Sequence, residues 1–472
     1  MNPLVLPDSE YQAVFERLTR LCLDYLATVP DRKSFPNVTG RETEEWFSTD
    51  LPEHGIGSAA LDDLRKAIDV CRPNSPRFFG YVFGSGEPVA AAADLLASVL
   101  NQNTTAWRSA PSGVTLERVV VGWLAEALGC PGFSGSLCGG GSPANLMALA
   151  MARESRLPAN EAGARPGTVY ASDQVHMSIP KAVALLGIGR AYLRLIPCDE
   201  AFRIRTGLLR EAIVRDVAAG LTPIAIVGSA GTVATGSIDP LRELAGIARE
   251  CGAWFHVDGA YGALAAIAMP ELFAGLDKAD SLSLDPHKWL YQPVDCGCLL
   301  YRDASAARTA FSHTGDYAKT LFEDPVENFA FFEESIELSR RFRALKLWLS
   351  LRYHGLAKFR EAIRNDLESA RRLVDLIGAE PALEVLAPVP LSAVCFRYVS
   401  KAGSSLGGDE LNQKILQRTV RRGKVFLSNA TIQGKFALRA CFVNHRTTPH
   451  DVEQIVAEVL AVGRELAAGA ES

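Results

Sequence analysis

The sequence lacks the marks of a membrane or secreted protein. Its 472 residues contain no run of about 18 apolar residues, the length that a membrane-spanning helix needs. Residues 1–8 also lack the basic start and the long apolar stretch of a signal peptide. We therefore expect a cytoplasmic protein that does not enter a membrane.

The sequence also has no excess of positively charged residues. The chain has 49 Lys and Arg against 54 Asp and Glu, a net charge of −5, and an isoelectric point near 6.0. Proteins that bind nucleic acids or anionic membranes usually carry a basic surface. The balance predicts no nucleic-acid partner and favours chemistry on a small molecule.

The ten cysteines do not form paired metal-binding motifs. The two closest, Cys296 and Cys298, lie in an apolar run, and no second Cys or His pair stands nearby to complete a zinc site. We expect reduced thiols in the protein core and no metal site.

The order of apolar segments predicts an α/β fold in a chain of ordinary globular composition, 48% hydrophobic and 22% charged. Residues 1–75 carry apolar side chains at helical spacing, including Tyr11, Val14 and Leu18, which predicts a helical docking segment. Between residues 76 and 345, short apolar runs alternate with amphipathic stretches, the pattern of a large domain with a mostly parallel sheet and helices on both faces. The apolar runs lie at 168–171, 224–227, 254–257, 281–284 and 297–300.

The pattern of apolar and charged residues changes in the last part of the chain. Residues 346–472 contain a long charged helical stretch at about 358–377, two strand-like segments at 391–399 and 424–443, and an amphipathic stretch from about Pro449. This order predicts a small C-terminal α+β domain.

Asp258 and Lys288 are the most informative residues of the large domain. Asp258 ends the run Trp254-Phe255-His256-Val257-Asp258, and Lys288 lies in Asp285-Pro286-His287-Lys288-Trp289. Pyridoxal phosphate needs a lysine amine to hold its aldehyde and a carboxylate to keep its pyridine nitrogen protonated. Alone, such an aspartate often forms a turn, and such a lysine is usually solvated. Because Asp258 follows a predicted strand, where open α/β sheets bind ligands, the pair predicts a pyridoxal phosphate site.

A glycine-rich turn offers a place for the phosphate. Gly139, Gly140 and Gly141 allow the backbone to approach an anion, and we expect Ser142 to cap a helix whose first residue is Pro143. The turn has neither the G-x-G-x-x-G dinucleotide fingerprint nor a Walker lysine.

Two further polar residues follow predicted strands. His176 comes just after the run at 168–171, where an imidazole could stack on a flat cofactor and handle a proton. Thr232 follows the run at 224–227 in the same way. Either residue alone could be a loop residue with local hydrogen bonds, but several suitable groups at strand ends favour one shared pocket.

These segments together resemble the group II pyridoxal-phosphate decarboxylases, the family of aromatic-amino-acid, histidine and glutamate decarboxylases. The aromatic-amino-acid decarboxylases are the most similar subgroup, through Phe79-Gly80-Tyr81 and residues 107–117. The segments that carry the resemblance are 77–81, 139–148, 172–178, 229–240, 256–262, 285–290 and 340–348.

The resemblance implies a fold type I enzyme, a homodimer with its active site at the subunit interface, which decarboxylates an L-amino acid with an aromatic or apolar side chain. It implies that Lys288 holds the cofactor covalently, that Asp258 faces the pyridine nitrogen and that His176 stacks on the ring. Further cofactor contacts are implied for Gly141, Ser142, Thr232, Ala260, Asp285 and His287. Tyr81, Phe83 and Trp107 fall where the family lines its substrate pocket.

One departure from the family pattern concerns the loop that supplies a proton. Counted back from Arg340, the position of the family's loop tyrosine is Phe331, also expected at the substrate, and a phenyl ring donates no proton. In the family this replacement is associated with aldehyde synthases, which decarboxylate and then consume oxygen. Tyr317 is the alternative proton donor and our catalytic prediction.

The residues leave the substrate and the activity open in three respects. The substrate could be non-aromatic, such as glutamate or 2,4-diaminobutyrate. The chain could be a catalytically silent pyridoxal phosphate protein, which the intact Lys288 and Asp258 argue against. Arg439 could hold a substrate carboxylate in the ring plane, which would favour transamination, but we expect it at the surface or in a dimer contact.

Overall fold

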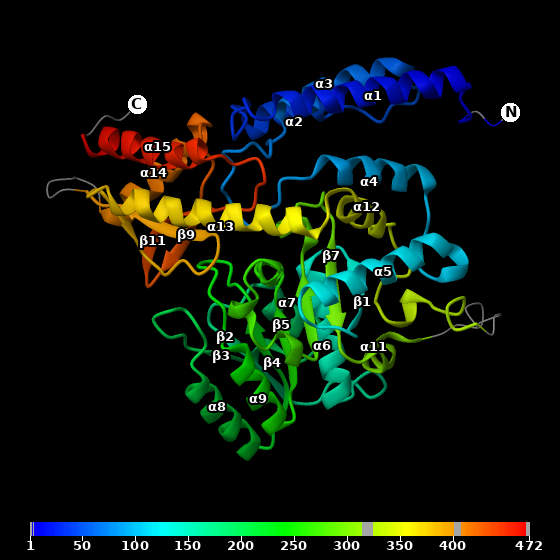
Figure 1. The fold of residues 1–472 in the computed structure, drawn as a ribbon, viewed down its shortest axis with the longest axis vertical. Coiled ribbons are helices and arrows are strands. Elements are labelled where there is room, and N and C mark those ends of the chain that lie inside the picture. The colour runs from blue at the N-terminus through cyan, green and yellow to red at the C-terminus, as the bar shows by residue number, and fades with distance from the viewer. Residues whose placement is uncertain (1, 3, 314–323, 401–406, 469–472) are drawn as a thin grey trace.

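The structure is a computed structural model that describes residues 2, 4–313, 324–400 and 407–468. Within these residues, the strands form a seven-stranded and a four-stranded sheet (Figure 1). The larger sheet has the order β1-β7-β6-β5-β4-β2-β3. Its strands are β1 (Ser134–Cys138), β2 (Gly167–Ser172), β3 (Leu193–Ile196), β4 (Thr222–Ser229), β5 (Trp254–Asp258), β6 (Ser281–Leu284) and β7 (Gly297–Tyr301).

The large sheet is mostly parallel, as predicted. Only β7 runs against its two neighbours, β1 and β6. The register sets Ser229 of β4 opposite Asp258 of β5, and Asp258 opposite Ser283 of β6. Because these three strands are parallel, their carboxyl ends meet at one edge of the sheet, which is where such sheets bind ligands.

Helices cover both faces of the large sheet (Figure 1). Alternate strand residues point to opposite faces, so that Ala225 and Val227 of β4 pack with one helical layer and Ile226 packs with the other. One layer contains α6 (Gly141–Arg156), α7 (Ser178–Leu185) and α11 (Ala304–Phe311). The other contains α5 (Pro111–Ala127), α8 (Thr206–Ala218) and α9 (Leu241–Cys251).

The four-stranded sheet is antiparallel, with the order β10-β11-β9-β8. The predicted helices at 358–377 and from Pro449 are present as α13 and α15. The division of the chain into domains at residues 75 and 345 remains a prediction. The elements are β8 (Leu383–Val385), β9 (Ala393–Tyr398), β10 (Ser428–Ile432), β11 (Lys435–Cys441), α13 (Leu356–Gly378), α14 (Gly408–Arg422) and α15 (Pro449–Ala467).

The N-terminal helices α1 (Asp8–Thr28), α2 (Gly40–Phe47) and α3 (Ala60–Val70) lie along one side of the molecule (Figure 1). None of these three helices buries a residue within the described chain. Below them lie α4 (Pro88–Leu100) and α12 (Ala344–His354). No helix in the described part of the chain is long and apolar enough to cross a membrane.

Candidate active site

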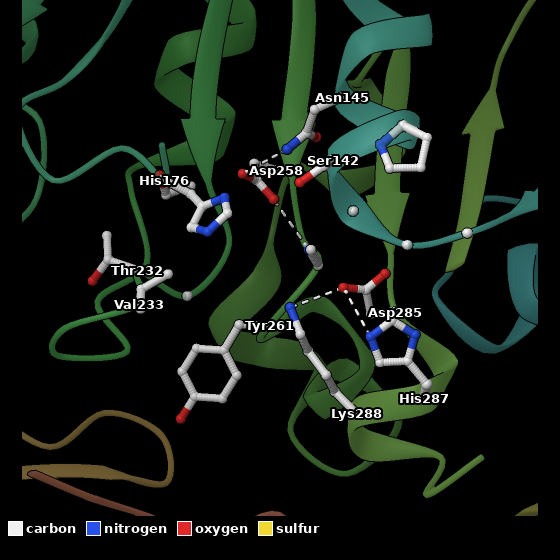
Figure 2. A pocket seen from close by; sticks show the side chains of 17 residues that line it. Ser142, Asn145, His176, Thr232, Val233, Asp258, Tyr261, Asp285, His287 and Lys288 are labelled. Atoms are coloured by element: carbon white, nitrogen blue, oxygen red, sulfur yellow. Dashed lines mark hydrogen bonds and ion pairs between the residues drawn. The ribbon is translucent and has the colours of Figure 1, made fainter. Parts of the chain in front are cut away.

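Segments at the carboxyl ends of five strands line one cavity (Figure 2). The turn after β1 contributes Gly139 to Gly141, and the loop after β2 contributes His176. Thr232 follows β4, Asp258 ends β5, and Lys288 lies on the short helix α10 (Pro286–Trp289) after β6. Residues that were predicted from separate parts of the sequence therefore meet in one place.

Asp258 is buried and surrounded by hydrogen-bond donors. Its Oδ1 accepts hydrogen bonds from the backbone N–H of Ala260 and the hydroxyl of Ser283, both at 3.2 Å. Its Oδ2 accepts one from the Nδ2 of Asn145 at 3.0 Å. Three donors and no acceptor suit a negatively charged carboxylate, so that Asp258 can place a charge against a protonated ring nitrogen.

Lys288 is paired with Asp285. The Nζ of Lys288 lies 2.8 Å from Asp285 Oδ2, and the Nε2 of His287 lies 3.5 Å from the same oxygen (Figure 2). Burial lowers the pKa of His287. Its Nδ1 accepts the backbone N–H of Cys296 at 3.2 Å, which leaves Nε2 to carry the proton. The other oxygen of Asp285, Oδ1, is buried with no hydrogen-bond partner within the described residues.

The glycine turn packs closely against its surroundings. A Cβ on Gly141 would lie 2.6 Å from the Cβ of Ala260, and a Cβ on Gly297 would lie 2.3 Å from the Cα of Gly140. Helix α6 begins at Gly141, with Gly140 as its N-cap. Ser142 is thus a residue of the first turn, and the prediction that it caps the helix was wrong. The contacts around the turn leave no room for a side chain at Gly141, so the turn requires glycine there. The first residues of α6, Gly141 and Ser142, still line the cavity, and the N–H groups of a helix N-terminus are suited to a phosphate.

His176 projects into the cavity beside Asp258 (Figure 2). Its Nδ1 lies 2.8 Å from the hydroxyl of Ser178 and accepts the backbone N–H of Ser178 at 3.3 Å. Burial lowers the pKa of His176, while Asp258 acts in the opposite direction. The imidazole is therefore neutral near pH 7.

Asn145 and Tyr261 also line the cavity and were not predicted. Asn145 is four residues after Gly141 on α6, so that the helical spacing places it on the same face, a signal that the sequence contains. Tyr261 packs against the ring of Trp289, with 5.4 Å between ring centres, and its hydroxyl lies 2.9 Å from that of Ser392. The contact with Ser392 joins segments 131 residues apart, and no local pattern indicates it.

A second cavity adjoins the first and shares Lys288 and His176 with it. Tyr81 and Arg439 line this second cavity. Tyr81 has a positive φ of 59°, an uncommon conformation for a residue with a large side chain, and its N–H donates to Ser428 Oγ at 3.3 Å. Strained residues of this kind often occur at functional sites.

We expected Arg439 at the surface or in a dimer contact. The structure instead buries its side chain at this second cavity. Its Nε donates to the carbonyl of Ala234 at 3.1 Å and its Nη1 to the carbonyl of Tyr81 at 3.0 Å. Among the described residues its Nη2 has no hydrogen-bond partner. The guanidinium thus holds the Tyr81 backbone in place.

Phe331 does not reach either cavity. Its ring is fully buried under Arg340, whose guanidinium carbon lies 4.2 Å from the ring centre, and meets Phe329 edge-on at 4.8 Å. Its N–H donates to the carbonyl of Thr105 at 2.8 Å. Counting back from Arg340 therefore led to a wrong position: this ring is an interior packing residue, held by a cation–π contact. Tyr317, the other proposed proton donor, lies outside the described residues.

Phe83 and Trp107 do not line the two cavities either. Phe83 packs edge-on against Phe78, with 6.4 Å between ring centres. Trp107 begins the short helix η2 (Trp107–Ser109), and its N–H donates to Phe329 at 3.0 Å. Their roles at the substrate remain predictions.

The residues of the first cavity fit pyridoxal phosphate. A helix N-terminus and close-packed glycines offer N–H groups for a phosphate, Asp258 offers a carboxylate for a ring nitrogen, and Lys288 offers an amine for an aldehyde. Asp285, which pairs with Lys288, is a further polar residue of the cavity lining. A mostly parallel sheet with these groups at its carboxyl edge defines a fold type I pyridoxal phosphate enzyme.

Comparison with known proteins narrows this class. Residues 47–399 match the model of the pyridoxal-dependent decarboxylase conserved domain. An aromatic-L-amino-acid decarboxylase of Bacillus atrophaeus is 36% identical over 463 residues, covering 97% of this chain and 95% of that protein. A 4-hydroxyphenylacetaldehyde synthase of Rhodiola rosea is 31% identical, covering 96% and 94%. The crystal structure of Oryza sativa TDC with PLP and tryptamine superposes with a TM-score of 0.92 at 28% identity, covering 99% and 100%.

The chain therefore belongs to the pyridoxal-dependent decarboxylase family. It is an amino-acid decarboxylase that uses pyridoxal phosphate as its cofactor.

Proposed function

We propose that the enzyme decarboxylates an aromatic L-amino acid to the corresponding amine and CO2. The observation that carries the aromatic assignment is Tyr81, which stands 58% exposed at a cavity shared with Lys288 and His176. Val82, Val175 and Val233 give that cavity apolar walls, and an aromatic side chain would pack on them. The names of the relatives support the same substrate class.

The residues of the chain have distinct roles in this proposal. When bound, pyridoxal phosphate supplies a conjugated ring that takes up the electron pair left by the departing CO2. Lys288 would hold the cofactor through its amine. Asp258 would keep a proton on the ring nitrogen, and His176 would stack on the ring. Gly141 and Ser142 hold the phosphate, with Thr232, Ala260, Asp285 and His287 around the rest of the cofactor.

The choice of bond depends on orientation. The residues of the site would have to hold the substrate so that its bond from Cα to the carboxylate breaks in preference to the Cα–H bond. Arg439 has two of its nitrogens engaged by the carbonyls of Ala234 and Tyr81, which supports a role in fixing the backbone of Tyr81. Tyr81 would then set the position of the substrate side chain.

The burial of Phe331 favours the amine over the aldehyde as product. The sequence argument for an aldehyde synthase required a phenyl ring at the proton-donor position, and Phe331 is packed in the interior. Tyr317 thus becomes the proposed donor of the proton that completes the amine. A positioned general acid typically speeds proton transfer by about 10²–10⁴-fold, which favours protonation over reaction with oxygen.

We also propose a cytoplasmic homodimer whose active site lies at the subunit interface. The apolar face of α1, with Tyr11 44%, Phe15 40% and Leu23 61% exposed, supports this assembly. Helix α4 adds exposed Leu95, Leu96, Val99 and Leu100. Apolar surfaces of this kind are typical of subunit contacts.

The test is to incubate the purified enzyme with tryptophan, tyrosine, phenylalanine, glutamate and 2,4-diaminobutyrate. Amine, aldehyde and peroxide are then measured. We expect amine from an aromatic substrate, no peroxide, and a KM that rises at least about tenfold in Tyr81→Ala, since one missing apolar contact costs roughly 1–3 kcal/mol. Tyr353→Ala, which removes an exposed tyrosine on α12, is the control and should leave KM unchanged.

Two outcomes would contradict the proposal. Turnover of glutamate or 2,4-diaminobutyrate alone would exclude the aromatic assignment, and stoichiometric peroxide would make the enzyme an aldehyde synthase. Borohydride reduction and peptide mapping complete the test, because the cofactor should be found on the peptide that contains Lys288. Recovery on another lysine would remove Lys288 from its proposed role.

A further inference from the structure

Asn145 connects Ser178 with two residues of β5, His256 and Asp258, that are more than 70 residues further along the chain. It lies on α6, is 1% exposed, and contacts Asp258, Ser178 and His256. We propose that Asn145 is a positioning residue which, through Ser178, fixes the ring proton of His176 on Nε2. His176 then acts as a hydrogen-bond donor to the substrate and not as a base. This inference rests on the role proposed above for His176.

The amide of Asn145 has only one orientation that satisfies its neighbours. Its two N–H groups donate to Asp258 Oδ2 at 3.0 Å and to Ser178 Oγ at 2.9 Å, and its Oδ1 lies 2.9 Å from the Nε2 of His256. A flipped amide would bring its oxygen against the Asp258 carboxylate, which has no proton to donate. Two like acceptors in a buried site would lose a hydrogen bond and repel each other.

This orientation determines the protonation of His256. The oxygen of Asn145 can only accept, so Nε2 of His256 carries the ring proton. The Nδ1 then accepts from the hydroxyl of Ser281 at 2.9 Å, which is closer than the Ser281 carbonyl at 3.3 Å. The Ser281 hydroxyl oxygen also accepts the indole N–H of Trp254 at 2.8 Å. His256 is fully buried, and burial lowers its pKa to about 4. The ring is thus a neutral group that anchors the far side of Asn145.

The same logic determines the protonation of His176. Because Ser178 Oγ accepts a hydrogen bond from the Nδ2 of Asn145, its own hydroxyl can donate to the Nδ1 of His176 at 2.8 Å. The backbone N–H of Ser178 also points to that nitrogen at 3.3 Å. An Nδ1 that faces two donors has no proton of its own. In the neutral ring the proton is therefore on Nε2.

The consequence is chemical selectivity. An imidazole with its proton on Nε2 can donate to an anionic substrate oxygen, but it cannot remove the Cα proton through that nitrogen. Removal of the Cα proton begins transamination, and loss of the carboxylate gives the amine. Asn145 and Ser178 thus favour decarboxylation without contacting the substrate.

The first test reads the histidine tautomers directly. In enzyme labelled with ¹⁵N-histidine, with and without pyridoxal phosphate, two-bond ¹⁵N–¹H correlations distinguish the two nitrogens, and the loss of a signal in His176→Gln assigns His176. We expect His176 to carry its proton on Nε2 in the wild type and a mixture of tautomers in Ser178→Ala and Asn145→Ala. Ser305→Ala, which removes a hydroxyl exposed on α11, is the control.

The behaviour of His256 separates a relay from general disruption. Asn145→Ala should change the His256 signal and Ser178→Ala should not, because Ser178 makes no contact with His256 among its hydrogen bonds. If Asn145→Ala does not fold, Ser178→Ala still decides the matter. A proton on Nδ1 of His176 in the wild type, or an unchanged His176 signal in Ser178→Ala, would overturn the proposal.

The second test reads the selectivity. Substrate recovered after partial turnover in D2O is examined for deuterium at Cα. We expect the ratio of exchange to decarboxylation to rise about tenfold or more in Ser178→Ala, a barrier change of about 1.4 kcal/mol. A ratio equal to that of the wild type would contradict the selectivity role. Failure of the proposed substrate class would appear separately, as absence of product in the wild type, and the tautomer measurement does not depend on it.

Discussion

At the scale of single residues, the site is a set of side chains whose protonation is set by their neighbours. Asp258 accepts three hydrogen bonds, and burial keeps His176 and His256 neutral. The sequence predicted Asp258, His176 and Lys288 because each follows a strand or stands in a distinctive motif. It did not predict Tyr261, whose partner Ser392 comes from a distant segment, and Asn145 was missed although its spacing from Gly141 on α6 indicates a shared helix face. A polar residue at the end of a strand can thus be predicted from the sequence, whereas the hydrogen-bond partners of a buried residue cannot.

Replacing Asp258 with Asn should separate cofactor binding from catalysis. An amide cannot hold a proton on the ring nitrogen, so we expect pyridoxal phosphate to remain bound while kcat falls on the order of 10²–10³-fold, the usual cost of losing one electrostatic contact in a buried site. The absorbance of bound cofactor and kcat measure the two effects. Asp277→Asn, at an exposed aspartate, is the control. Near wild-type kcat in Asp258→Asn would disprove the assigned role.

His256 should make the protein less stable in acid. Its folded-state pKa is about 4 against an ordinary value of 6.5. Between these values the unfolded chain binds a proton that the folded chain does not, so stability falls as the pH drops, by up to about 3 kcal/mol. Asp239 and Asp366, whose pKa values burial raises to about 6 and about 7, act in the opposite direction. The difference between wild type and His256→Gln therefore isolates the histidine.

We expect His256→Gln to have a lower Tm at neutral pH but a smaller drop between about pH 7.5 and pH 5, measured on the holoenzyme by differential scanning calorimetry. Parallel pH profiles for the two proteins would show that His256 does not titrate on unfolding.

At the scale of elements, the apolar pattern predicted most strands and long helices of the structure. All five apolar runs of the large domain are strands, and α13 and α15 lie where helices were expected. Strand β1 was missed because its residues, Ser-Gly-Ser-Leu-Cys, are small and mostly polar, and β3 because it is a short, partly exposed edge strand. Both are strands by virtue of the sheet around them, and tertiary context of this kind overrides local propensity.

The glycine turn before α6 should tolerate no side chain. Gly141→Ala would bring its Cβ 2.6 Å from Ala260 and 3.2 Å from Asp285 Oδ2, which displaces the phosphate-binding N–H groups. We expect the Kd for pyridoxal phosphate to rise at least about tenfold, about 1.4 kcal/mol, in fluorescence titrations. Gly246→Ala on α9, where nothing lies within 4 Å, is the matched control. Equal affinities in the two variants would remove this turn from the phosphate site.

We expect opposite effects from substitutions at two aromatic residues, Phe331 in the short helix η8 (Phe331–Glu333) and Tyr317. Phe331→Tyr adds a hydroxyl to a ring that is fully buried, so we expect a loss of about 1–3 kcal/mol in stability and no change of product. Tyr317→Phe should instead yield aldehyde and peroxide in place of amine. Oxygen uptake and product analysis of both variants provide the measurement. A shift of product in Phe331→Tyr alone would restore Phe331 to the proton-donor position.

At the scale of the whole molecule, the N-terminal helices carry little packing of their own. The chain has a mass of 50.9 kDa, and we expect a particle of twice that mass in sedimentation equilibrium. Phe15→Asp with Leu23→Asp should shift the mass toward the monomer and reduce activity, because charges on the apolar face of α1 would be buried at the interface. Val214→Asp, at an exposed apolar residue of α8, should leave the mass unchanged. A double variant that remains fully dimeric would contradict the docking role of α1.

The contact between Gly297 and Gly140 has a consequence for how the protein tolerates variation. Any side chain at position 297 would overlap the backbone of the turn, so even alanine is excluded there. In a saturation library selected for activity, position 297 should be as intolerant as Lys288, although glycine contributes no reactive group. Cys296 and Cys298 on either side should accept isosteric replacements. A map of mutational tolerance would thus mark a residue that supports the glycine turn from behind, although it has no reactive group of its own.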